Sequence, residues 1–179
     1  MISMNIVLGR FQPFHKGHAF LVDEALSRGD TVIAIGSSNA EASFSNPWSA
    51  EEREEMIRIW LGEREAKIVK IPDINDPPNW VEHARKYHGD GILVTSDETT
   101  KNLYEKSNFE TEWIEMKDRE SYEGWRVRAT LKMLSTVYET EAQKEVMSAS
   151  IPEKVVEWLV DNDALYRLYA MSRDLEHVG

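Results

Sequence analysis

The chain contains no cysteine, and this absence excludes several kinds of site at once. Without a thiol there is no disulfide scaffold, no cysteine nucleophile and no cysteine-ligated metal. Long apolar segments are also missing, because no uninterrupted run approaches the roughly 20 residues that a membrane-spanning helix needs. Residues 1–5 lack the basic and apolar parts of a secretory signal peptide. We therefore expect a cytoplasmic protein with no membrane partner.

Positive charge is scarce as well. The sequence has 21 Lys and Arg against 32 Asp and Glu, which gives a formal net charge of −11. A field of that sign repels polyanions, so we expect no nucleic-acid partner. It also repels free nucleotides, so any phosphate site must be a local cationic pocket. With 179 residues, of which 41% are hydrophobic, the chain is long enough to close a sizeable core.

Short apolar runs typical of buried strands recur along the chain. They show no polar alternation, as expected for strands covered on both faces of a parallel sheet. The candidates are residues 5–8, 31–35, 67–71, 92–95 and 113–116.

Helical patterns lie between these runs. One begins at Ser49, with Glu52 three residues later as in a capping box, and Asn79 and Ser150 give similar start signals. The alternation predicts an α/β fold, a Rossmann-like parallel sheet with helices on both faces and a helical C-terminal part. We predict one domain over residues 1–179, with the Rossmann-like core over 1–135 and a helical extension over 136–179.

The most informative segment is GRFQPFHKGH, residues 9–18, between the first strand and the first helix. In an open parallel sheet, ligands bind at the carboxyl ends of strands, and a helix N-terminus there offers N–H groups to an anion. Gly9 and Gly17 leave room for a phosphate beside the backbone. His15 and His18 are spaced to face one side of the helix start, and Arg10 adds positive charge.

These residue types suit nucleotidyl transfer. That reaction needs an in-line approach and neutralisation of charge on the α-phosphate and the departing pyrophosphate, but no protein nucleophile. Two imidazoles, an arginine and a helix terminus supply this, and we assign the protein no metal site of its own. A loop with surface histidines is the alternative, which the position of HxGH between strand and helix disfavours.

In these residues the chain resembles the HxGH nucleotidyltransferases, and within them the archaeal-type nicotinamide-nucleotide adenylyltransferases. After GRFQPFHKGH the resemblance continues in order along nearly the whole chain. It is carried by IGSS (35–38), NPWSAEER (46–53), IPDI (71–74), NWVEH (79–83), DRESYEGWRVR (118–128) and IPEKVVE (151–157).

The resemblance implies a reaction and its catalytic residues. ATP and nicotinamide mononucleotide (NMN) would be the substrates and NAD and pyrophosphate the products, with Mg²⁺ carried on the triphosphate. His15 and His18 would bind the ATP phosphates and stabilise the transition state, and Arg10 would contact a phosphate from the same loop. By family analogy alone, the protein would be a homo-oligomer.

The resemblance also implies nucleotide-binding residues. Trp80 matches the aromatic residue that stacks on the nicotinamide ring, and an indole face suits a flat cationic pyridinium. An ordinary core role for Trp80 stays open, because aromatic residues usually contribute by burial. Arg128 matches the late arginine that holds the β- and γ-phosphates. The remaining expected contacts are Gly9, Phe11, Gly17, Gly36, Ser37, Asp73, Gly124 and Arg126.

The chain departs from the family in two places. Where the family has Ser-Gly-Thr before the late arginine, this sequence reads Glu-Gly-Trp over residues 123–125, and where similar enzymes have an arginine it has Ser45. Arg126 or Lys101 could replace the lost triphosphate contacts. Arg126 could act together with Arg128 only if the segment is not helical, because residues two apart on a helix point to different sides. Residues 136–147 look like a surface insertion.

Two other functions stay open. One keeps the HxGH chemistry with another phosphorylated acceptor or with CTP. The other is a non-catalytic module that binds NAD or another nucleotide, motivated by Ser45 and Trp125. Nothing in the sequence separates NMN from nicotinic acid mononucleotide as the acceptor.

Overall fold

The computed structural model describes residues 3–176, which fall into two compact units. The first unit comprises Met1–Arg10, His18–Ala40 and Glu63–Lys117. The second comprises Phe11–Gly17, Glu41–Gly62 and Asp118–Gly179. The division of one domain at residue 135 stays a prediction.

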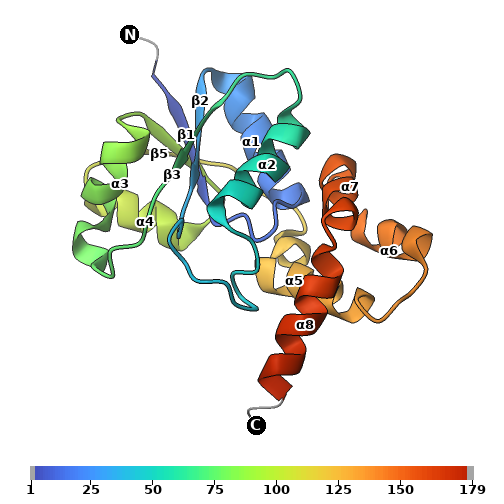
Figure 1. The fold of residues 1–179 in the computed structure, drawn as a ribbon. Coiled ribbons are helices and arrows are strands. Elements are labelled where there is room, and N and C mark those ends of the chain that lie inside the picture. Colours follow the sequence, from blue (N-terminus) through green and yellow to red (C-terminus); the bar gives the residue numbers. More distant parts are fainter. Residues whose placement is uncertain (1–2, 177–179) are drawn as a thin grey trace. The chain divides into compact units, whose positions relative to one another are not determined.

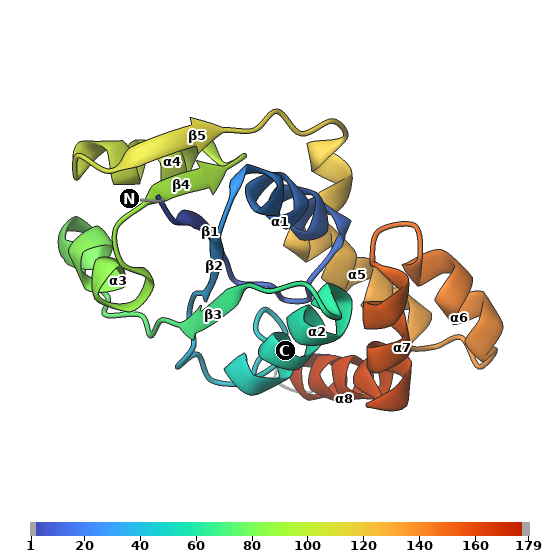
Figure 2. The same cartoon turned by 90° about the horizontal axis from the view of Figure 1, so that it is seen from above.

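The first unit contains a five-stranded parallel sheet (Figure 1). Its strands follow one another in the order β3-β2-β1-β4-β5 (Figure 2). Its strands are β1 (Asn5–Gly9), β2 (Thr31–Ile35), β3 (Lys67–Lys70), β4 (Ile92–Thr95) and β5 (Glu110–Trp113). The chain runs outward from β1 to β3 and then returns to β4 on the other side of β1. The strand order therefore reverses between β1 and β4, where ligands bind in folds of this kind.

The sheet is built around its apolar central strands. β1 pairs with β2 along its whole length, from Asn5 opposite Thr31 to Gly9 opposite Ile35. Every residue of β2 is buried, as its unbroken apolar run predicts.

The fifth strand was predicted at the wrong place. It lies at Glu110–Trp113 and not at residues 113–116. β5 is an edge strand that pairs only with β4, and three of its four residues are exposed. An exposed edge strand needs no apolar run, so the apolar pattern pointed to the residues that follow it.

Helices cover both faces of this sheet, as predicted. They are α1 (Lys16–Arg28), which lies in the first unit from His18 onward, α3 (Trp80–His88) and α4 (Glu98–Lys106). Figure 2 shows α1 on one face and α3 and α4 on the other. A 3₁₀ turn, η1 (Pro77–Asn79), leads into α3.

The core of the first unit includes one histidine with a structural role. His88 Nδ1 lies 2.7 Å from the Gly89 carbonyl oxygen, and His88 Nε2 lies 3.0 Å from the Tyr104 hydroxyl. Burial lowers the pKa of His88, so the ring stays neutral and holds α3 against α4.

The second unit is helical, as predicted for the C-terminal part. It contains α2 (Ala50–Leu61), α5 (Gly124–Leu134), α6 (Thr140–Met147), α7 (Glu153–Asp161) and α8 (Ala164–Glu176), with a 3₁₀ turn η2 (Arg119–Tyr122) before α5. Within residues 3–176, every helix is too short or too polar to cross a lipid bilayer.

The predicted start signals had mixed outcomes. The capping box at Ser49 is present, with the Glu52 amide donating to Ser49 Oγ and the Glu52 carboxylate accepting from the Ser49 amide. Asn79 makes no cap bond, because its side chain donates to Asp76 instead. The N-cap of α7 is Pro152 and not Ser150.

The last two helices hold the NPWSAEER segment within the second unit. Arg167 of α8 donates to the Pro47 carbonyl oxygen at 3.1 Å and to the Glu52 carboxylate at 2.7 Å. Trp158 of α7 donates its indole N–H to Glu55 at 3.0 Å. These bonds fix the start of α2.

Candidate active site

In the first unit, the loops that follow β1 and β2 are joined at the carboxyl edge of the sheet. The Gly36 amide donates to the Gly9 carbonyl oxygen at 2.9 Å. A Cβ at Gly36 would make only ordinary contacts, the nearest at 3.7 Å from that oxygen. The protein itself does not require a glycine there, so the position has room beside its backbone. Ser37 follows with a left-handed φ of 47°.

The loop after β3 is tied to the same edge. The Ser38 amide donates to the Ile71 carbonyl oxygen at 3.0 Å. The Asn39 side chain accepts from the Asp73 amide at 2.9 Å and donates to the Asp73 carbonyl oxygen at 3.3 Å. The predicted residues Gly9, Gly36, Ser37 and Asp73 are thus brought to one edge. Asn39 was not among the residues predicted from the sequence, where only its loop position gave a signal.

Trp80 combines burial with exposure. Its ring packs against two core clusters of the first unit, one around Ile6 and Leu93 and one around Ala34 and Ile71. It meets Tyr104 edge-on at 6.3 Å between ring centroids. The side chain nevertheless stays half-exposed, so the sheet holds the indole rigidly while leaving part of it accessible.

The two other candidate residues of the first unit differ in exposure. Arg10 directly follows β1 and is exposed, whereas His18 in the first turn of α1 is half-buried. Both are close in sequence to the end of β1.

In the second unit, His15 is held in one orientation. The Gly17 amide donates to His15 Nδ1 at 3.1 Å, which places the proton of the neutral ring on Nε2. The ring stacks on Tyr122 at 6.2 Å between centroids, with the planes 22° apart. Only 5% of His15 is exposed.

The surroundings of His15 keep it uncharged. Burial, and then the positive charge of Arg128, lower its pKa from 6.5 to about 4. At neutral pH the ring is therefore an N–H donor through Nε2 and not a cation.

Gly17 is required by the protein itself. A Cβ at this position would lie 2.8 Å from the Tyr122 Cβ and 3.0 Å from the His15 ring. The reason predicted for a glycine here was close approach of a phosphate, whereas the packing of His15 and Tyr122 already demands it.

The start of α1 offers fewer N–H groups than the sequence suggested. The Lys16 amide donates to the Ser150 carbonyl oxygen at 2.8 Å, and the Gly17 amide donates to His15. Two of the first amides of the helix are therefore used within the protein. A phosphate at this helix start would meet fewer free backbone amides than the sequence suggested.

Arg128 lies beside His15 and over the first turn of α5. Its Nη1 donates to the Gln12 carbonyl oxygen at 2.9 Å. A Cβ at Gly124 would lie 3.0 Å from the same nitrogen, so the glycine makes room for the guanidinium. The structure thus brings together three of the predicted residues, His15, Gly124 and Arg128, and adds Gln12.

Arg126 is placed differently from Arg128. The segment is helical from Gly124, so the condition under which both arginines could bind one triphosphate is not met. Arg126 pairs with Glu123 at 3.3 Å and lies over the Trp125 ring at 4.9 Å. It lines a separate hollow of about 380 Å³ with Tyr122 and other residues of η2, α5 and α6.

The remaining predicted residues occupy varied environments. Phe11 is only 1% exposed, with its ring packed on Phe14, so only its backbone is placed to meet a ligand. Ser45 lies in an exposed loop, 3.2 Å from the Ser43 hydroxyl. Lys101 pairs with Glu105 at 3.2 Å along α4.

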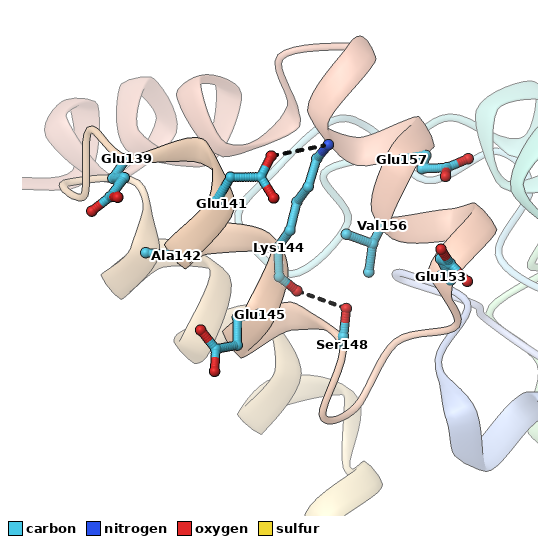
Figure 3. A pocket seen from close by; sticks show the side chains of 9 residues that line it. All are labelled: Glu139, Glu141, Ala142, Lys144, Glu145, Ser148, Glu153, Val156 and Glu157. Atoms are coloured by element: carbon cyan, nitrogen blue, oxygen red, sulfur yellow. Dashed lines mark hydrogen bonds and ion pairs between the residues drawn. The ribbon is translucent and has the colours of Figure 1, made fainter.

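A hollow of about 650 Å³ lies between α6 and α7 (Figure 3). Five glutamates line it, and its one lysine, Lys144, lies 3.8 Å from a carboxylate oxygen of Glu141. Such an excess of carboxylates repels a triphosphate. Among residues 3–173, whose side chains the structure describes, no group of three or more His, Asp and Glu side chains is placed to hold a metal ion.

The comparisons with known proteins extend along most of the chain. Residues 6–154 match the family described as cytidylyltransferase-like. A nicotinamide-nucleotide adenylyltransferase of Thermoplasma volcanium is 31% identical over 96% of this chain and 94% of that protein. A protein of the same name from Ignicoccus hospitalis is 36% identical over 70% of this chain and 77% of its own length.

A solved structure shares the fold. It is a bifunctional NMN adenylyltransferase/ADP ribose pyrophosphatase from Francisella tularensis complexed with AMP and a Mn ion. The TM-score is 0.59 at 18% identity, covering 92% of this chain and 54% of that one. This chain therefore spans about half the length of that protein.

The environment of His15 predicts a pH-dependent stability. Its pKa is about 4 in the folded protein and 6.5 when the residue is unfolded, so between these values only the unfolded chain takes up the proton. Stability is therefore lost as the pH falls from 6.5 towards 4, by up to about 3 kcal/mol.

His15→Asn tests this prediction, because asparagine keeps an acceptor for the Gly17 amide but cannot titrate. Urea unfolding at pH 7 and pH 4 should show a smaller loss for the variant than for the wild type, and equal losses would contradict the assigned environment.

Proposed function

The chain belongs to the cytidylyltransferase-like family and, within it, to the nicotinamide-nucleotide adenylyltransferases, and from this we infer that it joins NMN to the AMP moiety of ATP. The products are NAD and pyrophosphate. The observation that carries the inference is the 31% identity over nearly the whole of both chains. The buried, neutral His15 lies beside Arg128 and within the loop of residues 9–18 that carries HxGH, hereafter the HxGH loop. This arrangement supports the chemistry.

The reaction needs little from the protein beyond positioning and charge stabilisation. An oxygen of the NMN phosphate attacks the α-phosphorus of ATP in line, and the bond to the bridging oxygen of pyrophosphate breaks. The attacking phosphate is already ionised at neutral pH, since the second pKa of a phosphate monoester is about 6. No general base is required, and the negative charge passes to the departing pyrophosphate. We assign Mg²⁺ to the triphosphate, as part of the substrate.

We assign His15 to the triphosphate as a neutral donor. The Gly17 amide holds Nδ1, so Nε2 carries the proton that can be donated to a phosphate oxygen. A donor fixed in advance in a buried site needs little reorganisation as charge develops. A bound polyanion would favour the charged ring and raise its pKa from the value in the free protein.

We assign Arg128 to the β- and γ-phosphates. Its guanidinium donates to the Gln12 carbonyl oxygen and lies over Gly124, which has no side chain to obstruct it. Five N–H donors in one plane suit paired phosphate oxygens. Arg126 is not needed for this role, because its salt bridge with Glu123 and its contact with Trp125 occupy it elsewhere.

The residues of the first unit are assigned to the same substrates. Gly9, Gly36 and Ser37 would let a nucleotide approach the backbone, and Arg10 and His18 would contact its phosphates. A Cβ at Gly36 would make only ordinary contacts, so packing within the protein does not explain a glycine at this position. This supports the assignment of Gly36 to the nucleotide. Asp73 and Trp80 would bind the nicotinamide end of NMN.

A direct assay tests the proposed function. The protein is incubated with ATP, Mg²⁺ and NMN, and NAD is measured by enzymatic reduction. We expect NAD and pyrophosphate in equal amounts. Parallel reactions replace ATP by CTP, or NMN by nicotinic acid mononucleotide. Turnover with CTP and another acceptor in place of NMN, or NAD binding without turnover, would contradict the proposal.

His18→Ala should lower kcat by roughly 10²–10³-fold, the usual cost of one donor to developing charge. Because His18 is half-buried, circular dichroism and the melting temperature are measured alongside kcat to show that the variant is folded. A folded variant with normal kcat would remove His18 from the mechanism.

Trp80→Leu should raise the KM for NMN, while the KM for ATP stays nearly constant. Leucine retains an apolar contact with the core clusters but offers no aromatic face. Trp80→Phe keeps such a face and is the matched control, with a smaller increase expected. Equal KM values in all three proteins, measured alongside their melting temperatures, would make Trp80 a core residue only.

A further inference from the structure

Gln12 lies in the middle of the HxGH loop and is nearly inaccessible, with 3% of its surface exposed. Its side-chain amide pairs with the backbone of Trp48. Nε2 donates to the Trp48 carbonyl oxygen at 3.0 Å, and Oε1 accepts from the Trp48 amide at 3.1 Å. The pairing resembles one rung of a β-ladder and joins the two most specific motifs of the sequence, GRFQPFHKGH and NPWSAEER.

The backbone of the same residue contacts a third motif. The Gln12 carbonyl oxygen accepts from Arg128 Nη1 at 2.9 Å. The two partners of Gln12 are thus 36 and 116 residues away in the sequence. Arg128 in turn lies close enough to His15 to lower its pKa.

Local geometry does not by itself hold this carbonyl in place. Phe11, just before Gln12, has a φ of 55°, which costs a non-glycine residue about 1 kcal/mol. The partner of Gln12 is better fixed, since Trp48 is 2% exposed and the carbonyl oxygen of Pro47 accepts from Arg167. The amide pairing therefore joins a strained loop to an anchored segment.

We infer that Gln12 is a positioning residue for nucleotidyl transfer: its side chain, clamped to Trp48, holds its carbonyl oxygen where it fixes Arg128 beside His15. The kinetic part of this inference rests on the proposed function. A buried amide could also serve stability alone, so the test must separate the two roles.

Gln12→Glu is the sharpest probe, because it preserves shape and the acceptor for the Trp48 amide. At neutral pH it places a carboxylate oxygen against the Trp48 carbonyl oxygen, and the two acceptors repel each other. We expect kcat to fall at least tenfold, with the KM for NMN changed less than twofold. Burial raises the pKa of the introduced carboxyl group, and its protonated form can donate to Trp48. The activity relative to wild type should therefore recover as the pH is lowered.

A double-mutant cycle identifies the residue through which Gln12 acts. In an Arg128→Met background, Gln12→Glu should lower kcat much less than it does in the wild type, because the group being positioned is already missing. Full additivity of the two effects would overturn the inference.

Asn5→Asp provides the matched control. Asn5 is also a buried amide, 4% exposed, whose Nδ2 donates to the Ala25 carbonyl oxygen at 3.2 Å. The same exchange of amide for carboxylate should lower the free energy of unfolding without changing kcat at temperatures where the variant is folded. If both variants lose stability and neither loses kcat, Gln12 is structural only.

A second readout does not need turnover. Gln12→Met removes both bonds to Trp48 without adding charge. If Arg128 then shifts away, the pKa of His15 should rise from its value in the wild type, which NMR titration of the imidazole measures. An unchanged titration in a folded Gln12→Met variant would overturn the inference. If the wild type made no NAD, the proposed function would fail, and this titration would still decide whether Gln12 positions Arg128.

Discussion

The hydrogen bond from the Gly17 amide to His15 Nδ1 determines what the histidine can do. It leaves the proton on Nε2 and keeps the ring in one orientation. The bond exists only because residue 17 has no side chain, since a Cβ would collide with Tyr122 and the imidazole. The glycine of HxGH is therefore required for the orientation of His15 in the protein without any ligand. Tyr122 completes this arrangement by covering one face of the ring.

The net charge of the chain and the partners of its basic residues bear on how it could hold an anion. The chain carries a net charge of −11, and many of its basic residues pair with carboxylates, as Arg126 does with Glu123. The hollow between α6 and α7 is lined mainly by glutamates. Arg128 donates to a neutral carbonyl oxygen, that of Gln12.

One departure from the expected family pattern, at residues 123–125, forms a cluster of its own in the second unit. Trp125, where the resemblance led us to expect a hydroxyl residue, donates its indole N–H to Glu123 at 2.7 Å and lies against Arg126. These three residues form one exposed cluster at the start of α5. The cluster uses the charge of Arg126 internally, which leaves Arg128 as the late arginine in contact with the HxGH loop. The glycine between Glu123 and Trp125 gives Arg128 the space to lie there.

Much of the fold could be read from the sequence because it depends on local patterns. Short runs rich in apolar residues marked β1 to β4, and the Ser49–Glu52 pair marked the start of α2, since both signals arise from neighbouring residues. The strand–loop–helix position of HxGH was predictable for the same reason. The tertiary structure alone decided the edge strand β5, where exposure removes the apolar signal. It also decided the contacts of Gln12 with Trp48 and Arg128, because these pairings depend on folding of the whole second unit. The use of the first α1 amides was decided in the same way, since Ser150 reaches Lys16 only after residues distant in sequence have packed together.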